Sequence, residues 1–434
     1  MLPGLICPAL LATLCCGSMV FAAEPQPFPK ILTLEQAVSM LDDNHPDRLF
    51  SEVDAADLNA EQAEIDAELG FTAFLSGELR QVDRLADPGH DFVDDSRVLI
   101  TLDKPLYRFG AAAADTRVIT AKRNANSLSA LSAREQNRLA MLTAYFDVLI
   151  ADFAYIAAFE EMTLKYLRFD DAREKMEEHG ELAEVDVRAL EAAYLDAFAK
   201  RTVTESEARA SRLRLALSLN RPDAYPDQLV EPDLKPYQRP TPDYETLLNE
   251  VLENGPAVRS AQLLVEAAQQ SVDQLQFTDR PTLGVRLRAA EYAETFSGSR
   301  DQFRGSVYLD VPLVQRRKNA VVLAERSADL LRVKTKLEVL KRDLRIHVLH
   351  LVQKLEEAET ELAAAKSELL YQELKLDKVR LQYEMELRAR IGSANADVAK
   401  AILRLAKVRY RKALLWERIH ALAGRTAIHS THSG

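Results

Sequence analysis

The sequence of this chain repeats once, and this constrains its fold more than any other feature. Residues 34–46 correspond to residues 244–256 at an offset of 210, and both copies carry an Asn-X-Pro break between two helical segments. Residues 102–106 match residues 309–313 at an offset of 207. The closing pair Leu219-Asn220 aligns with Ala423-Gly424. Self-similarity of this kind indicates that one structural unit occurs twice in the fold.

Each half contains two segments in which apolar and polar residues alternate. They cover residues 71–80 and 97–104 in the first half, and residues 282–289 and 303–311 in the second. Period two is typical of a β-strand with one apolar and one polar face. A length of about ten residues suits a tilted transmembrane strand, and arginine on each polar face favours a water-filled lumen. A pair of amphipathic hairpins on a soluble sheet has the same period and remains the alternative.

Long helices are predicted for most of the remaining chain. From Leu344 to Tyr383 apolar or small residues recur at alternating steps of four and three. This is a heptad seam of about 40 residues, or about 60 Å of helix, which exceeds what a compact domain needs. The apolar stretch from Leu139 onward carries Asp147 and Asp152, each costing about 2.5 to 3.5 kcal/mol near the centre of a bilayer. We therefore interpret this stretch as a buried segment of a helix bundle.

The N-terminus has the features of a secretory signal peptide that is cut after Ala22, although no Lys or Arg precedes its apolar run. All three cysteines, Cys7, Cys15 and Cys16, lie in this segment, so the mature chain would have none. Disulfides and thiolate chemistry are thereby excluded. Lipidation at Cys15 or Cys16 is a competing interpretation. A secreted chain without a spanning helix is periplasmic, extracellular or inserted through β-strands.

Composition and proline content set further limits. The chain has 56 Lys and Arg against 67 Asp and Glu, a net charge of −11, which argues against nucleic acid as a partner. Six prolines between Arg221 and Pro242 leave no room for a helix. We divide the chain into a signal peptide (1–22), a first repeat (23–220), a linker (221–242), a second repeat (243–424) and a disordered tail (425–434). The first repeat has a β-hairpin at 70–106 and a helical tip near 180. The second has a β-hairpin at 281–313 and a helical tip near 386–392.

Four short motifs follow one another along the chain. They are the repeat opening over residues 32–46, the post-hairpin residues 105–110, the helix stretch 144–149 and the hairpin tip 180–187. In this order, with a second copy and behind a signal peptide, they resemble the TolC family of outer-membrane efflux proteins. The resemblance implies a mainly α protein with a β-barrel portion, in which three identical chains each give four strands to one shared barrel. An α-helical periplasmic tunnel of long paired helices continues the barrel.

The resemblance also implies the partners and the important residues. Such a channel has no catalytic residues and no cofactor or metal, sits in outer-membrane lipid, and docks a periplasmic adaptor and an inner-membrane pump. Gly180 matches the glycine of the hairpin turn, where glycine supplies the left-handed conformation. In the second half the residue aligned with Gly180 is Glu386, so the expected glycine is missing there. Gly392 restores the glycine of the turn only if this copy carries a short insertion. The candidates for adaptor docking at the two tips are Gly180, Val185, Asp186, Val187, Glu386 and Gly392.

The two tips differ in charge. The first carries six acids and one lysine, whereas the second carries three arginines and two glutamates. Attraction of Glu181 and Asp186 to Arg388 and Arg390 could hold a tunnel entrance closed, although exposed pairs contribute only about 0.2 to 1 kcal/mol each. For any single residue, a solvated helix end is the alternative.

The function predicted from these observations is a trimeric outer-membrane exit duct of a tripartite efflux or secretion system, which conducts substrate passively. A periplasmic coiled-coil scaffold with small soluble hairpins is the alternative. A secreted hydrolase is disfavoured, because no nucleophile-base spacing or glycine-rich loop is found. His347 and His350 have a possible metal spacing but no third ligand, and the same holds for His429 and His432, so we expect structural roles. The substrate and the class of pump are left open.

Overall fold

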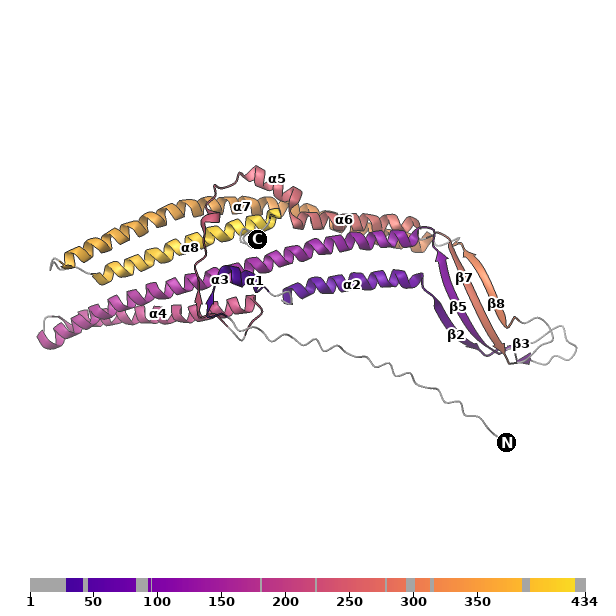
Figure 1. The fold of residues 1–434 in the computed structure, drawn as a ribbon, viewed down its shortest axis with the longest axis horizontal. Coiled ribbons are helices and arrows are strands. Elements are labelled where there is room, and N and C mark those ends of the chain that lie inside the picture. The colour runs from indigo at the N-terminus through magenta and orange to yellow at the C-terminus, as the bar shows by residue number, and fades with distance from the viewer. Residues whose placement is uncertain are drawn as a thin grey trace, which may run out of the picture.

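The structure is a computed structural model of an elongated chain (Figure 1). A β-sheet lies at one end, two pairs of long helices reach the other end, and the middle of the molecule contains the start of the first repeat and the end of the second. The expected signal peptide and the expected disordered tail beyond Arg425 lie outside the described residues. These are residues 29–41, 46–82, 93–94, 96–179, 182–222, 225–277, 279–293, 301–312, 316–384 and 391–425.

The first repeat begins with a short helix whose start the sequence encodes. Thr33 Oγ1 accepts a hydrogen bond from the Gln36 backbone N–H at 3.2 Å, and Gln36 Oε1 accepts one from the Thr33 N–H at 3.0 Å. This capping box satisfies two N–H groups that have no partner within the helix. The elements are β1 (Ile31–Leu32), α1 (Leu34–Ser39), α2 (Pro46–Glu68), β2 (Thr72–Glu78), β3 (Gln81–Val82), β4 (Val93–Asp94), β5 (Arg97–Tyr107), α3 (Ala111–His179) and α4 (Glu184–Ser218).

The second repeat has the same order of elements. The Asn-X-Pro break acts alike in both copies, because Pro46 begins α2 and Pro256 begins α6. Proline suits this position, since the first helical residue needs no N–H donor. The predicted fold class, two repeats of a β-hairpin with long helices, is confirmed. The elements are α5 (Tyr244–Asn254), α6 (Pro256–Gln274), the 3-10 turn η2 (Leu275–Phe277), β7 (Thr282–Tyr292), β8 (Phe303–Asp310), α7 (Arg316–Glu384) and α8 (Ile391–Ala423).

The two repeats also close in the same way. Asn220 and Gly424 follow the last turns of α4 and α8 and have φ values of 55° and 68°. In each case the next residue donates its N–H five residues back along the chain, from Arg221 to the Ala216 carbonyl and from Arg425 to the His420 carbonyl. This is the Schellman arrangement, which needs a left-handed residue and therefore favours Gly or Asn there.

The linker between the repeats crosses the middle of the molecule (Figure 1). It contains β6 (Gln228–Leu229), which pairs in parallel with β1, and a single 3-10 turn, η1 (Lys235–Tyr237). The expectation that its prolines leave no room for a helix was therefore wrong for one short turn. Pro236 lies in the first turn of η1, where its missing N–H costs nothing.

The main hydrophobic core lies in the same middle region and draws on both repeats. Tyr145 and Phe146 of α3 and Tyr410 of α8 are almost completely buried there. The Tyr145 hydroxyl donates towards the carbonyl oxygens of Leu32, at 3.0 Å, and Val230, at 2.7 Å, which fixes the β1–β6 pair against α3. By length and composition alone, α3 is apolar enough to cross a membrane. Most residues from 141 to 149 of α3 are buried in the core, as predicted, whereas Ile156 and Phe159 farther along are exposed.

The heptad seam runs along α7 as predicted. Val348, Leu351, Leu355, Ala358 and Ala365 are buried. The later seam residues towards the tip are half-buried, because there α7 has fewer neighbouring helices in one chain.

Candidate channel wall and helical tips

The two hairpins combine into one antiparallel sheet of order β2-β5-β7-β8. The central pair β5–β7 joins the first repeat to the second, with Leu102 opposite Leu287 and Asp103 opposite Arg286. β2 and β8 are its two edges, so the described strands of one chain do not close a barrel.

One face of this sheet is apolar and exposed. Because the pairing places Val285 opposite Val307 and Leu283 opposite Leu309, these residues share a face. Val307 is 71% exposed and Leu309 is 56% exposed. Contiguous exposed apolar surface of this kind marks a surface that contacts protein or membrane. The apolar residues on this face are Ala73, Leu75, Val98, Ile100, Leu102, Leu283, Val285, Leu287, Phe303, Val307 and Leu309. The register also places two charged residues on it, Lys104 opposite Val285 and Glu291 opposite Val98.

The opposite face carries a polar network. Arg286 Nε donates to Asp103 Oδ2 at 2.6 Å, and the Tyr308 hydroxyl donates to Asp103 Oδ1, also at 2.6 Å. The Tyr308 side chain crosses β7 at Gly284, where a Cβ would lie only 2.4 Å from the ring. Thr282 and Ser306 lie on this face, as predicted. Arg80 was expected on the polar face of the first strand, but β2 ends at Glu78.

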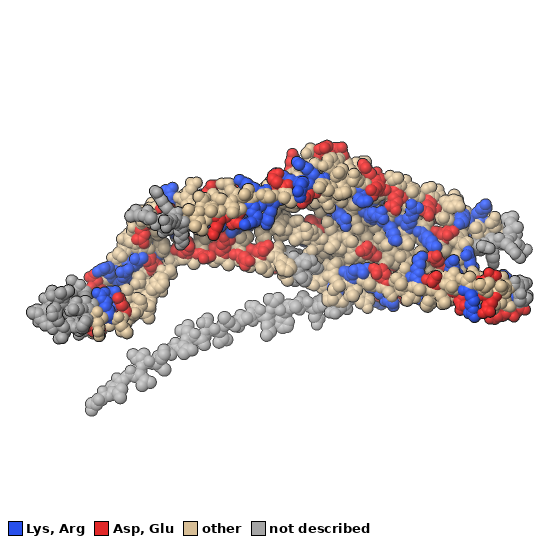
Figure 2. All heavy atoms as spheres, turned by 180° about the vertical axis from the view of Figure 1, so that it is seen from behind, with Lys and Arg blue, Asp and Glu red and all other residues tan. Residues whose placement is uncertain are grey.

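The first helical tip lies between α3 and α4. Gly180 and Glu181 fall outside the described residues. α4 begins after Ala183, which makes no side-chain cap, and Asp186 in its first turn is exposed at the positive end of the helix dipole. Val185 is 72% exposed, whereas Val187 is 4% exposed, so only the first valine is open to a partner. Figure 2 shows acidic side chains gathered at the end of this helix pair.

The second tip differs from the expected pattern. Glu386, Arg388 and Arg390 lie outside the described residues. The sequence left the position of this turn between Glu386 and Gly392 open, and Gly392 is the second residue of α8. A Cβ on Gly392 would lie 3.4 Å from Leu164 of α3, so this glycine lies close to the other helix pair rather than forming the turn.

Described charges near the tips pair mainly within their own helices. Arg188 binds Glu191 and Glu184 of α4, and Arg380 lies 3.9 Å from Asp377 of α7. Farther from the tips, Glu161 of α3 binds Lys200 of α4 at 2.9 Å and Lys400 of α8 at 3.2 Å. Burial alone would raise the pKa of Glu161, but the two lysines lower it below its ordinary value. Glu161 therefore links the two helix pairs electrostatically.

A buried polar cluster in the middle of the molecule was not anticipated from the sequence. Glu417 of α8 is completely buried, forms an ion pair with Arg138 of α3, and accepts a hydrogen bond from the Tyr237 hydroxyl of η1 at 2.6 Å. Arg138 also donates to Glu135 Oε2 at 3.0 Å. The cluster thus connects both repeats and the linker. Glu417, which with Arg418 interrupts the apolar run Ala413 to Ile419, was the available signal.

No metal site is found in the part of the chain that the structure describes. It contains no group of three or more His, Cys, Asp or Glu side chains arranged to hold a metal ion. His347 and His350 both lie within α7. His429 and His432 lie outside the described residues.

No family model matches the sequence. Protein CyaE of Bordetella pertussis is 28% identical over 234 residues, which cover 52% of this chain and 48% of that protein. The match thus spans about half the length of this curated relative.

Several solved structures share the architecture. CusC, described in crystal structures of transmembrane channel formation, has a TM-score of 0.70 at 11% identity, covering 91% of this chain and 92% of its own. The outer membrane protein VceC of Vibrio cholerae has a TM-score of 0.68 at 14% identity, covering 90% of this chain and 96% of its own. The Campylobacter jejuni CmeC outer membrane channel has a TM-score of 0.69 at 11% identity, covering 97% of this chain and 94% of its own. The chain therefore has the TolC-like fold of these outer-membrane proteins, which confirms at the level of fold the resemblance found in its motifs.

Proposed function

We propose that this protein is the outer-membrane exit duct of a tripartite efflux or secretion system. Three copies would form one barrel from their four-stranded sheets, and their helices would form a tunnel through the periplasm. Substrate would pass through it passively, without catalysis by this chain.

The four-stranded sheet is the observation that carries this proposal. One face exposes apolar residues such as Ile100 and Val307, and the other carries the Asp103–Arg286–Tyr308 network. A sheet with one apolar and one charged face suits a wall between lipid and water. The open edges β2 and β8 have unpaired backbone groups, which lipid does not tolerate. Pairing β8 of one copy with β2 of the next satisfies both edges, and three copies supply twelve strands.

The long helices suit the periplasmic part of the duct. α3 and α7 each have 69 residues, or about 100 Å at 1.5 Å per residue. Both helix pairs expose apolar side chains, among them Val203 of α4 at 68% and Leu374 of α7 at 61%. A scaffold that worked as a monomer would leave these side chains in water. Packing against neighbouring copies buries them and favours the tunnel over the scaffold.

The tips are the proposed contact with the periplasmic adaptor, which in turn binds the inner-membrane pump. Val185 and Asp186 are exposed at the start of α4, so this end of the duct offers one apolar and one acidic contact. Gly180, Glu386 and the gate charges remain candidates from the sequence. Gly392 is less suited to direct contact, because it is half-buried beside α3.

Fractionation and oligomer size test this proposal together. Expressed with its N-terminal segment, the protein should stay with outer membranes after a high-salt wash and should be a trimer by light scattering in detergent. Reconstituted in planar bilayers, it should conduct ions. Release by salt, or a monodisperse monomer whose strands are folded, would favour the soluble scaffold instead.

A further inference from the structure

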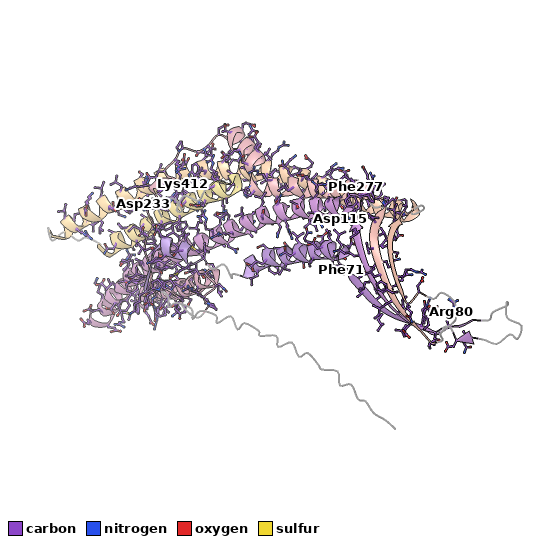
Figure 3. All side chains as sticks on the ribbon, turned by 45° about the vertical axis from the view of Figure 1, so that its right-hand side comes forward. Phe71, Arg80, Asp115, Asp233, Phe277 and Lys412 are labelled. Carbon is purple, nitrogen blue, oxygen red and sulfur yellow. The ribbon has the colours of Figure 1, made fainter. Side chains whose placement is uncertain are left out.

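A cavity of about 350 Å³ lies where the helices meet the sheet. Its lining comes from α2, α3, α6 and η2, with Arg108 from the segment before α3 and Arg326 from α7. Figure 3 shows Asp115 of α3 and Phe277 of η2 near each other in this region. The volume is within the range of small-molecule sites.

Two ion pairs line the cavity, and three further charged residues of the lining, Glu64, Asp115 and Arg326, have no ion pair among the described residues. Glu61 of α2 binds Lys122 of α3 at 2.6 Å, and Glu68 of α2 binds Arg108. Asp115 has only a neutral hydrogen-bond partner among the described residues, the side-chain amide of Gln274. The lining holds one more carboxylate than cationic groups. Its local charge therefore favours a cation.

Burial removes water from the Asp115 carboxylate, and the hydrogen bond from Gln274 replaces only part of that hydration. Burial raises its pKa above the ordinary value, although Gln274 and Arg108 act in the opposite direction. A positive charge placed beside this carboxylate would stabilise its ionised form. An ammonium group offers that charge and several N–H donors at once.

Ser271 of α6 gives an independent indication of a ligand. This serine lines the cavity and is 7% exposed, and its Oγ has no hydrogen-bond partner among the described residues. Buried hydroxyl groups are rarely left unpaired, because the loss of a hydrogen bond costs about 1 to 3 kcal/mol. A ligand with a donor group would satisfy the Ser271 oxygen.

Apolar residues in the rest of the lining favour a ligand that also carries an apolar organic part. Val118 and Ile119 of α3, Ile65 of α2 and the Phe277 ring supply apolar surface next to Asp115. A second cavity of about 410 Å³ shares Glu61 and Lys122 with the first and is lined by Leu58, Ala125 and Leu264, among others. The ion pair of Glu61 and Lys122 lies between the two cavities.

We infer that the cavity between α2, α3 and α6 binds a small organic ammonium ion with an apolar body. The ammonium group donates to the Asp115 carboxylate and to Ser271 Oγ, and the apolar body lies against Phe277, Val118 and Ile119. A metal ion fits less well, because the described lining offers no cluster of three ligands. The inference concerns binding in the wall of the protein and does not depend on conduction.

The test uses the full chain purified in detergent and the fluorescent amine dansylcadaverine, with anisotropy as the measurement. Neutral N-butyl dansylamide is the matched probe, and it reports partition into the detergent around the sheet. Wild-type protein should bind the amine at least about tenfold more tightly than the neutral probe, which corresponds to about 1.4 kcal/mol. Equal binding of the two probes would overturn the inference.

Two variants locate the site. Asp115→Asn keeps the shape and an acceptor for Gln274 and should weaken amine binding about tenfold, with little effect on the neutral probe. Ser271→Ala should weaken amine binding about threefold and removes only a hydroxyl, so it remains informative if the first variant alters oligomer size. Asp170→Asn, an exposed position on the same helix, is the control. If Asp115→Asn and Asp170→Asn bind the amine equally well, the cavity is not the site.

Discussion

The two long helix pairs have nearly the same lengths but differ in the contacts that hold them together. α3 and α7 both have 69 residues, and α4 and α8 have 35 and 33. Tyr194 of α4 contacts Tyr166 and Phe169 of α3, with ring centroids 5.4 and 6.0 Å apart. When α4 and α8 are aligned from their first residues, the position of Tyr194 is taken by Ala401.

Ion pairs join the second helix pair along the corresponding region. Lys375 binds Asp397 at 2.7 Å, Arg411 binds Glu361 at 2.7 Å, and Arg404 binds Glu368. Ion pairs also cross the first helix pair, between Glu161 and Lys200 and between Asp152 and Arg212. The two repeats therefore share a backbone and charged contacts, and the aromatic cluster around Tyr194 distinguishes the first pair. In the proposed trimer the tunnel wall would alternate between these two kinds of helix pair.

The largest expected effect concerns the point where both repeats meet. Arg138→Ala should lower the free energy of unfolding by about 3 to 5 kcal/mol, because Glu417 would stay buried without its charged partner. Urea unfolding followed by circular dichroism measures the change. The double variant Arg138→Met with Glu417→Gln should recover most of the loss. A loss below about 1 kcal/mol in the single variant would show that the two repeats do not depend on this ion pair.

The two faces of the sheet should respond differently to an added charge. Val285→Arg and Leu309→Arg each place a charge on the apolar face and should cost about 2 to 4 kcal/mol if that face contacts lipid near its midplane. Thr282→Arg and Ser306→Arg lie on the polar face and should be accepted. Folded yield in outer membranes and thermal stability of the oligomer are the measurements. Equal tolerance at all four positions would refute the face assignment.

Substitutions within the helix pairs test their different chemistry directly. Tyr194→Ala should cost about 2 kcal/mol, since aromatic pairs contribute beyond their buried area, and salt should not change this loss. Lys375→Met should cost about 0.2 to 1 kcal/mol, and the loss should shrink as salt screens the pair with Asp397. Unfolding at low and high salt compares the two. The same salt response in both variants would contradict the contrast between the repeats.

The smallest effects per contact are expected at the tips. Arg388→Glu with Arg390→Glu should raise conductance in planar bilayers, because weak attractions to Glu181 and Asp186 are replaced by repulsion around the trimer. The rise should be smaller at high salt. Adding Glu181→Lys and Asp186→Lys should restore closure. Unchanged conductance in the first variant would mean that the two tips are not electrostatic partners.

Much of the fold could be predicted because local patterns specify local elements. The heptad steps from Leu344 onward predicted a long helix with one buried seam, and α7 has it. The Asn-X-Pro breaks and the closing pair Leu219-Asn220 marked helix ends that the structure confirms. Less could be predicted for the tips. The sequence left the second turn open between Glu386 and Gly392, and it gave no sign that Gly392 of α8 lies close to Leu164 of α3.

By itself, the sequence of this protein determined the repeat, the period of each segment and the two faces of its strands, because these depend on residues close together in the chain. Only the tertiary structure decided that Glu417 would meet Arg138 and Tyr237, which lie 279 and 180 residues away. It likewise brought Asp115 beside Gln274, at a separation of 159 residues. Contacts of this kind depend on how whole helices pack. A charged residue in an apolar run signals that a partner is needed, but it does not identify that partner.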